Sequence, residues 1–279
     1  MIGFAHALYW AALAATAGAA VLFAIAASFG RQQFQAYGVA ATALALALLT
    51  AGLGLRWSVA GHGPYLGLYE ALASYAWVLL ALYLAAQWRL PQLRMAGVLA
   101  APGALLLLGS GVLSASAPQY QSPAMRSMWL WLHVGMAKVA LASLVVGAGA
   151  SLVYLRRART AVVAALGLVV VAASAEQFAL EDLSVRLVSL GFLVLAVVIA
   201  TGAVWANTAW GAYWSWDPIE TWALATWVIY GGVLHLHRTM GIAQAKWAWL
   251  NLSALCLSAF LFLVLRLLAL SPHWIYTKP

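Results

Sequence analysis

Apolar segments of about twenty residues recur along the whole of this chain, with only short polar connections between them. Hydrophobic residues make up 66% of the sequence and charged residues 7%, against roughly 25% charged residues in an ordinary soluble domain. A soluble fold could not bury that much apolar surface. Because a bilayer core about 30 Å thick requires ~20 apolar residues per helix, the sequence predicts an all-α, polytopic membrane helix bundle.

We expect about eight transmembrane helices within a single membrane domain that covers residues 1–279. The predicted spans are Ala5–Phe29, Phe34–Leu55, Leu68–Trp88, Met95–Leu113, Trp131–Leu155, Leu187–Trp205, Ile219–His237 and Trp247–Leu270. A membrane β-barrel would show short segments of alternating apolar and polar residues, and this sequence has none. The apolar segment Ala161–Ala175 is too short to cross, so we expect it to be interfacial or re-entrant.

Lysine and arginine residues predict the orientation of these spans. One side carries Arg31, Arg89, Arg94, Arg156, Arg157, Arg159, Arg186, Arg238 and Lys246; the other has only Arg56, Arg126, Lys278 and, near helix ends, Lys138 and Arg266. By the positive-inside rule the first side is cytoplasmic, so both termini and the connection from Trp205 to Pro218 face outward. The net charge of +8 reflects this topology. No basic track interleaved with aromatic residues indicates a nucleic-acid partner.

Cysteine content and the N-terminal sequence restrict the function classes further. The single cysteine, Cys256, excludes a disulfide framework and a CxxC thiol pair within this chain. It lies in the last apolar span, where we expect a small buried apolar residue. The N-terminus lacks the charged region and the cleavage site of a removed signal peptide, so we expect the first helix to be retained.

The most informative segment is the predicted outer connection at about residues 205–222. It reads Trp205-Ala-Asn-Thr-Ala-Trp210-Gly-Ala-Tyr-Trp214-Ser-Trp216-Asp217-Pro-Ile-Glu220-Thr-Trp222. Tryptophan and tyrosine gather at membrane interfaces, but such a belt is spread over several helix ends. Here the aromatic residues crowd one connection and its flanks, which suits a flat, mostly apolar ligand. From the pattern alone, the segment is either a ligand platform or an interfacial belt.

The two carboxylates in this segment fit a structural role better than acid–base catalysis. Asp217, Pro218 and Glu220 have the spacing of the N-cap, first and third positions of the following helix. This arrangement is a capping box, with proline at the position where its missing N–H does no harm. The prediction is that Asp217 determines how the aromatic connection enters the next helix.

Three histidines are candidate metal ligands. His133 begins the fifth predicted span, and His273 follows the eighth span on the same predicted outer side. Two histidines from different helices that flank an aromatic platform could supply both axial ligands of a haem iron. His235 lies sixteen residues beyond Ile219, hence roughly 24 Å deeper along a helix. Ionisable groups at such depth mark a pathway or a site, although a solvated helix end is the alternative for His235 and its neighbour His237.

These residues resemble the WWD signature of the CcsA/ResC family, the membrane subunits of system II cytochrome c synthases in bacteria and chloroplasts. The resemblance covers most of the chain after about residue 55 and extends well beyond the aromatic connection. It rests on Gly202-Ala-Val-Trp205-Ala-Asn207, the run from Trp210 to Leu224, Leu180-Glu-Asp-Leu-Ser-Val-Arg186 with Gly191-Phe192, Arg56-Trp57, Gly61-His62, Pro64, Tyr69-Glu70 and Leu132-His133-Val134.

The resemblance implies specific roles for the three histidines. The family's histidines that match His133 and His273 ligate haem b under the WWD loop. The match at His273 rests on its position, since Ser271-Pro272-His273-Trp274 departs from the family's usual local sequence. The histidine that matches His235 belongs to a second haem site within the membrane, with His237 as an alternative match. The other ligand there comes from the partner subunit, CcsB/ResB, whose large outer domain is not part of this chain.

The implied function is to move haem outward and present it to apocytochrome c. Trp210, Trp214, Trp216 and Trp222 would hold the porphyrin, and thiols of the apocytochrome CxxCH motif would add to the vinyl groups. Arg56, Arg126, Lys138 and Arg266 are the candidates for binding the propionates. The resemblance places the protein in a bacterial cytoplasmic or thylakoid-type membrane. The alternative is a haem exporter or chaperone of the CcmC type, which shares a WWD loop but has no ligation activity.

Overall fold

The computed structural model of this protein describes residues 1–114, 123–165 and 175–268. Within these residues all regular structure is helical, which confirms the predicted all-α fold. There are eight α-helices, α1 to α8, and two short 3₁₀-helices, η1 and η2. Their bounds are α1 Ile2–Phe29, α2 Gln32–Ala60, α3 Leu68–Arg89, η1 Pro91–Ala96, α4 Gly97–Val112, η2 Pro123–Arg126, α5 Met128–Ala165, α6 Ala175–Trp210, α7 Pro218–Met240 and α8 Gln244–Leu268.

Among the described residues, six helical segments are long and apolar enough to cross a membrane, so this is a multi-pass membrane protein. They are α1, α2, α3, η1 together with α4 (Pro91–Val112), and the described parts of α5 (Met128–Ala158) and α6 (Phe178–Trp210). α7 and α8 lie beside these helices but are not among the six. That they also cross the membrane remains a prediction.

α5 and α6 are longer than the spans predicted for them. They contain 38 and 36 residues, whereas the predicted spans were Trp131–Leu155 and Leu187–Trp205. No glycine or proline lies between residues 151 and 165 of α5, so nothing stops the helix where the apolar window ends. The start of the predicted interfacial segment Ala161–Ala175 is therefore part of α5, its last residue begins α6, and residues 166–174 lie outside the described residues.

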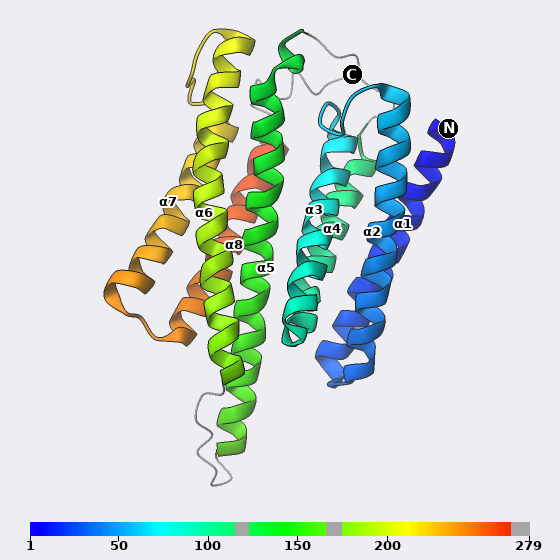
Figure 1. Ribbon diagram of the computed structural model, residues 1–279. Helices are drawn as coiled ribbons and strands as arrows, with labels where there is room; N and C mark the ends of the chain where they lie inside the picture. The colour runs from blue at the N-terminus through cyan, green and yellow to red at the C-terminus, as the bar shows by residue number, and fades with distance from the viewer. Residues whose placement is uncertain (115–122, 166–174, 269–279) are drawn as a thin grey trace.

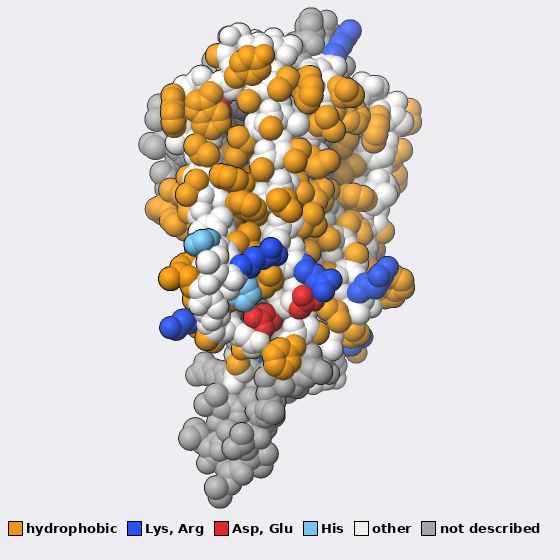
Figure 2. Space-filling view, turned by 60° about the vertical axis from the view of Figure 1, so that its left-hand side comes forward, with side chains coloured by type: hydrophobic (Ala, Val, Ile, Leu, Met, Phe, Trp, Pro, Cys, Tyr) orange, Lys and Arg blue, Asp and Glu red, His pale blue; other side chains and the backbone are white. Residues whose placement is uncertain are grey.

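The helices form a bundle with two distinct ends (Figure 1). The upper end carries the N-terminus and the connections between α2 and α3 and between α6 and α7. The lower end carries the α1–α2, α3–α4 and α7–α8 connections, which bring Arg31, Arg89, Arg94 and Lys246 together at one level. Figure 2 shows charged and histidine side chains gathered in a band near the lower end of one face, below a largely hydrophobic surface. This grouping is the charge asymmetry on which the orientation prediction depends.

The antiparallel contact between α5 and α6 has a regular register along its length. On α6, Ser184, Val188, Gly191, Leu195, Val198, Gly202 and Trp205 recur every three or four residues and form the face of the helix turned toward α5. Glycine permits close approach on both helices. A Cβ at Gly147 would lie 3.1 Å from Val188, and one at Gly191 would lie 2.7 Å from Leu144. Such small residues are typical of membrane helix interfaces.

The lower half of this seam carries a buried polar cluster. The hydroxyls of Ser151 and Ser184 are 2.8 Å apart, and the side-chain amide of Asn251 in α8 donates to Ser151 over 3.0 Å. The indole N–H of Trp247 donates to Ser184 over 3.2 Å. Because polar groups inside a membrane domain need partners, these hydrogen bonds join α8 to the α5–α6 pair.

At the upper end, a buried ion pair connects α2 and α3. The Arg56 guanidinium donates to the Glu70 carboxylate from Nε over 3.0 Å and from Nη2 over 2.8 Å, and both side chains are almost fully buried. Between these residues, the carbonyl of Pro64 accepts hydrogen bonds from Ser74 and from Lys138 of α5. The α2–α3 connection is thereby fixed against the upper part of α5.

The Arg56–Glu70 pair gives a direct test of this packing. Breaking a buried pair leaves one uncompensated charge and costs about 3–5 kcal/mol, whereas replacing both partners by apolar residues often costs much less. Glu70→Ala should therefore lower the thermal midpoint in detergent more than the double variant Arg56→Met/Glu70→Leu. Tryptophan fluorescence during heating measures both midpoints.

Asp182→Ala provides the matched control, because Asp182 pairs with Arg186 at 2.8 Å on the exposed surface. Exposed pairs contribute little to stability, so this variant should unfold close to the parent. A double variant that unfolds at a lower temperature than Glu70→Ala would contradict the role assigned to the buried pair.

Candidate functional site

A hollow lies at the upper end between α5, α6 and the α6–α7 connection, which comprises residues Gly211–Asp217. It contains about 400 Å³ of space, part of which is open to the surroundings. Its lining is mostly apolar and includes one imidazole and one carboxylate; the residues are His133, Val198, Ile199, Gly202, Ala203, Tyr213, Trp214, Ile219, Glu220 and Ala223. A mostly apolar lining with a few polar groups is typical of a small-molecule site.

His133 contributes the imidazole, and its ring lies against the backbone of α6. Its Nδ1 is 2.9 Å from the carbonyl oxygen of Val198. A carbonyl only accepts hydrogen bonds, so Nδ1 carries a proton, and in the neutral form of the ring the lone pair lies on Nε2. This is the arrangement by which proteins orient a metal-ligating histidine. The structure therefore brings one predicted iron ligand, His133, to the wall of the hollow.

The α6–α7 connection is shaped by hydrogen bonds at both of its ends. Gly211 closes α6 with a positive φ of 81°, and its N–H donates to the carbonyl of Asn207 over 3.0 Å. At the other end, Asp217 Oδ1 accepts from the Ile219 N–H over 2.8 Å, and the Glu220 carboxylate accepts from the Asp217 N–H over 3.2 Å. The predicted capping box is thus confirmed.

Glu220 does more than complete the capping box. Its carboxylate also accepts a hydrogen bond from the backbone N–H of Ser215 over 2.9 Å. One side chain at the start of α7 therefore fixes two backbone groups of the connection, at Ser215 and Asp217. The carboxylate that lines the hollow is thus part of the structure that gives the connection its shape.

Trp214 and Trp216 of this connection have different surroundings although their rings are in contact. Trp214 lines the hollow, while the Trp216 side chain is 70% exposed. Trp216 has φ of 58°, the one positive φ at a non-glycine residue in the described chain. Bulky residues rarely adopt this backbone conformation, which costs of order 1–3 kcal/mol. The two rings meet edge to face with centroids 5.7 Å apart, so Trp216 extends the aromatic surface outward from the hollow.

The other two predicted tryptophans do not line the hollow. Trp210 packs edge to face on Trp205, with centroids 5.2 Å apart. Both belong to a cluster with Tyr65 of the α2–α3 connection. The indole N–H of Trp222 donates to the backbone carbonyl of Ser258 in α8 over 2.8 Å. Trp210 and Trp222 thus attach the flanks of the connection to neighbouring elements.

Gly202 and Tyr213 line the hollow but were not predicted as site residues from the sequence. For Gly202 there was a signal, since a glycine in the middle of a long apolar helix often marks a close helix contact. What the glycine contacts depends on the pairing of α5 with α6, which the sequence does not show. Tyr213 had no signal of its own among the surrounding aromatic residues.

His235 and His237 lie near the lower end of α7 and face different surroundings. His235 is exposed, with Nδ1 3.3 Å from the hydroxyl of Thr239 in the next turn. His237 is turned inward: its Nε2 is 4.0 Å from the Glu181 carboxylate of α6, and its ring lies 4.6 Å from that of Trp247 in α8. His235 lies near the end of α7 at the lower end of the bundle, and His133 lies near the start of α5 at the upper end, so the structure places them toward opposite ends, as predicted from the sequence.

The remaining predicted site residues lie elsewhere or outside the described part. His273, Lys278 and the side chain of Arg266 are outside the described residues. Arg56 is paired with Glu70, and Lys138 is buried with its ammonium 3.3 Å from the Pro64 carbonyl. Arg126 is exposed at the end of η2. Cys256 was expected to be buried but is exposed on α8, because it lies on a face of that helix that no described helix covers.

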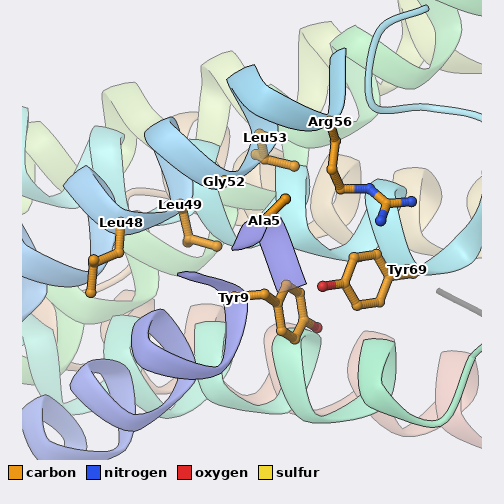
Figure 3. Close-up of a pocket in the computed structure, with 8 residues that line it drawn as sticks. All are labelled: Ala5, Tyr9, Leu48, Leu49, Gly52, Leu53, Arg56 and Tyr69. Carbon is orange, nitrogen blue, oxygen red and sulfur yellow. The ribbon is translucent and has the colours of Figure 1, made fainter. Parts of the chain in front are cut away.

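A second, smaller hollow of about 210 Å³ lies at the upper end between α1, α2 and α3 (Figure 3). Apolar residues of α1 and α2 line one side of it. On the other side the Arg56 guanidinium stands over the ring of Tyr69, 4.8 Å from its centroid, and Tyr69 stacks on Tyr9. Of the predicted site residues, only Arg56 lines it. It is separate from the hollow beside His133.

Residues 65–273 match the family described as Cytochrome C assembly protein. The Cytochrome c biogenesis protein CcsA of Gloeothece citriformis (strain PCC 7424) is 33% identical, over 86% of this chain and 87% of the relative. The CcsA protein of Synechococcus sp. (strain CC9605) is 36% identical, over 83% of this chain and 84% of the relative.

Among solved structures, the Cytochrome c Heme Lyase CcmF has a similar fold. The TM-score is 0.69 at 15% sequence identity, and the match covers 93% of this chain but 46% of CcmF. At that identity the likeness concerns the fold alone. The relatives and the matched residues, taken together with the membrane helix bundle, show that this chain belongs to the CcsA family of cytochrome c assembly proteins.

Proposed function

We propose that this protein binds haem in the hollow beside His133 and presents it to apocytochrome c for thioether attachment. The observation that carries the proposal is the His133 ring, oriented by the Val198 carbonyl at the wall of an aromatic hollow. Membership of the CcsA family supports a role in cytochrome c maturation. Haem is here the cargo and substrate of the protein.

The residues around the hollow fit haem. Haem is flat and largely apolar, and its iron is coordinated by an imidazole nitrogen of histidine. The hollow offers the His133 imidazole and the indole of Trp214 within a mostly apolar lining. The indole N–H of Trp214 is buried, and no hydrogen-bond partner for it occurs among the described residues. A buried donor of this kind is costly unless a ligand oxygen accepts from it.

In this proposal His133 and His273 are the two axial ligands of haem b. His273 follows α8, whose C-terminal end lies beyond the last described side chains, and its role is inferred from the sequence resemblance. Two imidazole ligands would keep the iron low-spin. The histidine of the apocytochrome CxxCH motif would then replace one of them, which releases the product.

The attachment reaction requires no nucleophile from this chain. Each apocytochrome thiol adds across a haem vinyl group: a carbon–sulfur bond forms, and the thiol hydrogen goes to the neighbouring vinyl carbon. No net oxidation takes place. The chain's own contribution is to hold the porphyrin with its vinyl groups accessible, because orientation of two reactants can supply a large part of a rate enhancement. Trp214 and Trp216 would form that surface, with Trp210 and Trp222 supporting it.

Haem would arrive from the lower end of the bundle, where His235 is exposed on α7. An ionisable group at membrane depth is a candidate functional site, and within the described residues His235 contacts only the Thr239 hydroxyl, 3.3 Å from its Nδ1. We assign the partner at this site to a separate CcsB/ResB-like membrane subunit, which would supply the second axial ligand there. The location that follows is a bacterial cytoplasmic or thylakoid-type membrane, with the α6–α7 connection on the outer side.

The visible spectrum of the protein purified with haem and a CcsB-like partner tests the two axial ligands. The parent should show sharp reduced α and β bands, and the double variant His133→Ala/His273→Ala should lose them because the iron loses both axial ligands. Added imidazole should restore the bands in part by filling the vacant positions. A parent without haem under these conditions would contradict the proposal.

Product formation separates a synthase subunit from a haem exporter or chaperone. Cells that express the chain, a CcsB-like partner and apocytochrome c should accumulate covalently bound haem, measured by haem staining after denaturing electrophoresis. An exporter would give the same spectrum for the membrane protein but no covalent product. The His133→Ala/His273→Ala variant serves as the negative control.

The two histidines of α7 should respond differently to substitution. His235→Ala should lower the total haem recovered with the protein, since it removes the ligand proposed for the lower end, and should leave the thermal midpoint unchanged. His237→Ala should lower the midpoint, because its ring contacts Glu181 and Trp247. Haem content by pyridine haemochrome and unfolding by fluorescence test both. The reverse pattern would assign the ligand role to His237.

Two variants of Asp217 test whether the connection requires a helix cap at this position or a negative charge. Asparagine caps helices nearly as well as aspartate, whereas alanine costs about 0.5–2 kcal/mol. Asp217→Asn should therefore retain haem and stability, and Asp217→Ala should lower both. Haem loss in Asp217→Asn at unchanged stability would show that the carboxylate itself acts on the ligand.

A further inference from the structure

A glycine of α6 determines how closely the His133 ring approaches the backbone. The ring reaches the carbonyl of Val198, four residues before Gly202 on the same face of α6. Side chains on a helix tilt toward its N-terminus, so a side chain at position 202 would cover the turn that contains Val198. A Cβ placed at Gly202 would lie 2.7 Å from both Cε1 and Nδ1 of His133. No Cβ tolerates such a contact without movement of the ring.

The hydrogen bond to Val198 also decides which ring nitrogen carries the proton. A histidine without that contact exchanges between two tautomers and can rotate about its side-chain bonds. With Nδ1–H donating to the carbonyl, the ring plane is fixed and the lone pair lies on Nε2. Hydrogen bonds of this type raise the basicity of a ligating imidazole, and their loss typically lowers metal affinity about 10–100-fold.

We infer that Gly202 is a positioning residue for haem: by leaving room for the His133 ring beside the Val198 carbonyl, it fixes the tautomer and the ring orientation of His133. This inference rests on the proposed function, in which His133 ligates the iron. According to this inference, haem binding requires a glycine in α6, the helix that also leads into the aromatic connection. The carbonyl of Val198 acts on the iron only through the imidazole.

The role of Gly202 predicts a specific change in haem binding. Gly202→Ala should lower the affinity for added haem about 10–100-fold and should change the reduced α and β bands, because the ring is displaced from α6. Haem titration followed by absorbance measures the affinity. Gly135→Ala is the matched control: Gly135 lies in α5 two residues from His133, is exposed, and has open space where a Cβ would be. The control should bind like the parent.

The same substitution in a His133→Gly variant distinguishes positioning of the His133 ring from a general effect on packing. In His133→Gly with added imidazole, the ligand is no longer attached to α5, so Gly202→Ala should change haem affinity less than threefold. An equal loss in both backgrounds would overturn the inference, as would no loss in the parent background or the same loss in Gly135→Ala. If Gly202→Ala alone fails to fold, His133→Gly/Gly202→Ala should regain the thermal midpoint of His133→Gly because the clashing ring is gone; failure to regain it would also overturn the inference.

The experiment separates this inference from the proposed function. A parent protein without haem bands contradicts the proposed function itself. A parent with haem bands that fade in His133→Ala but persist unchanged in Gly202→Ala leaves the proposed function in place and removes only the positioning role.

Discussion

The close antiparallel contact between α5 and α6 determines where most other parts of this protein lie. In a membrane, apolar side chains gain little by leaving lipid for a protein interior, so helices associate through close packing and hydrogen bonds. The α5–α6 contact contains both close packing and hydrogen bonds. Gly147 and Gly191 permit close packing in its middle, the hydroxyls of Ser151 and Ser184 meet at its lower end, and the His133 ring meets the Val198 carbonyl at its upper end. The proposed iron ligand is therefore one of the contacts that holds the two helices together.

The α6–α7 connection shows a different kind of constraint, which is local to a few residues. Glu220 accepts hydrogen bonds from the backbone at Ser215 and Asp217, and Asp217 caps α7. These bonds offset the unfavourable backbone conformation of Trp216 that they enforce. The same capping arrangement thus accounts for the exposed indole of Trp216 in its strained position and for the buried carboxylate of Asp217 directly after it. Both flanks of the aromatic surface, at Trp210 and Trp222, are attached to other elements.

Features that depend on a few neighbouring residues could be predicted from the sequence, and features that depend on helix pairing could not. The apolar spans and the capping box at Asp217 belong to the first kind. The contact of Gly202 with His133 belongs to the second, since the two residues meet only when α5 and α6 adopt one particular register. The four tryptophans were predicted to share one role because they share one segment. Only Trp214 lines the hollow, because no periodicity continues across a connection to indicate which way each ring faces.

Histidines and charges show the same limit. His235 and His237 are two residues apart on α7 and hence roughly 200° apart around the helix, so one faces outward whenever the other faces α6 and α8. Which one does so depends on the positions of Glu181 and Trp247. Arg56 was a candidate for a haem propionate, and its pairing with Glu70 across the α2–α3 connection was not foreseen because it requires the fold of that connection. His273 lies outside the described residues, so its role stays a prediction.

α5 has contacts on two sides, and this has a mechanical consequence. It touches α3, α4 and η1 on one side and α6 and α8 on the other, while α1 and α2 pack on α3 and α4. A tilt of the first four helices relative to the last three therefore has to displace α5 or shear its contacts. Since His133 lies in the first turns of α5 and its hydrogen-bond acceptor lies on α6, such a tilt would change the distance between ring and carbonyl. A partner that presses on α1–α4 would in this way shift the His133 ring relative to α6 without touching the hollow.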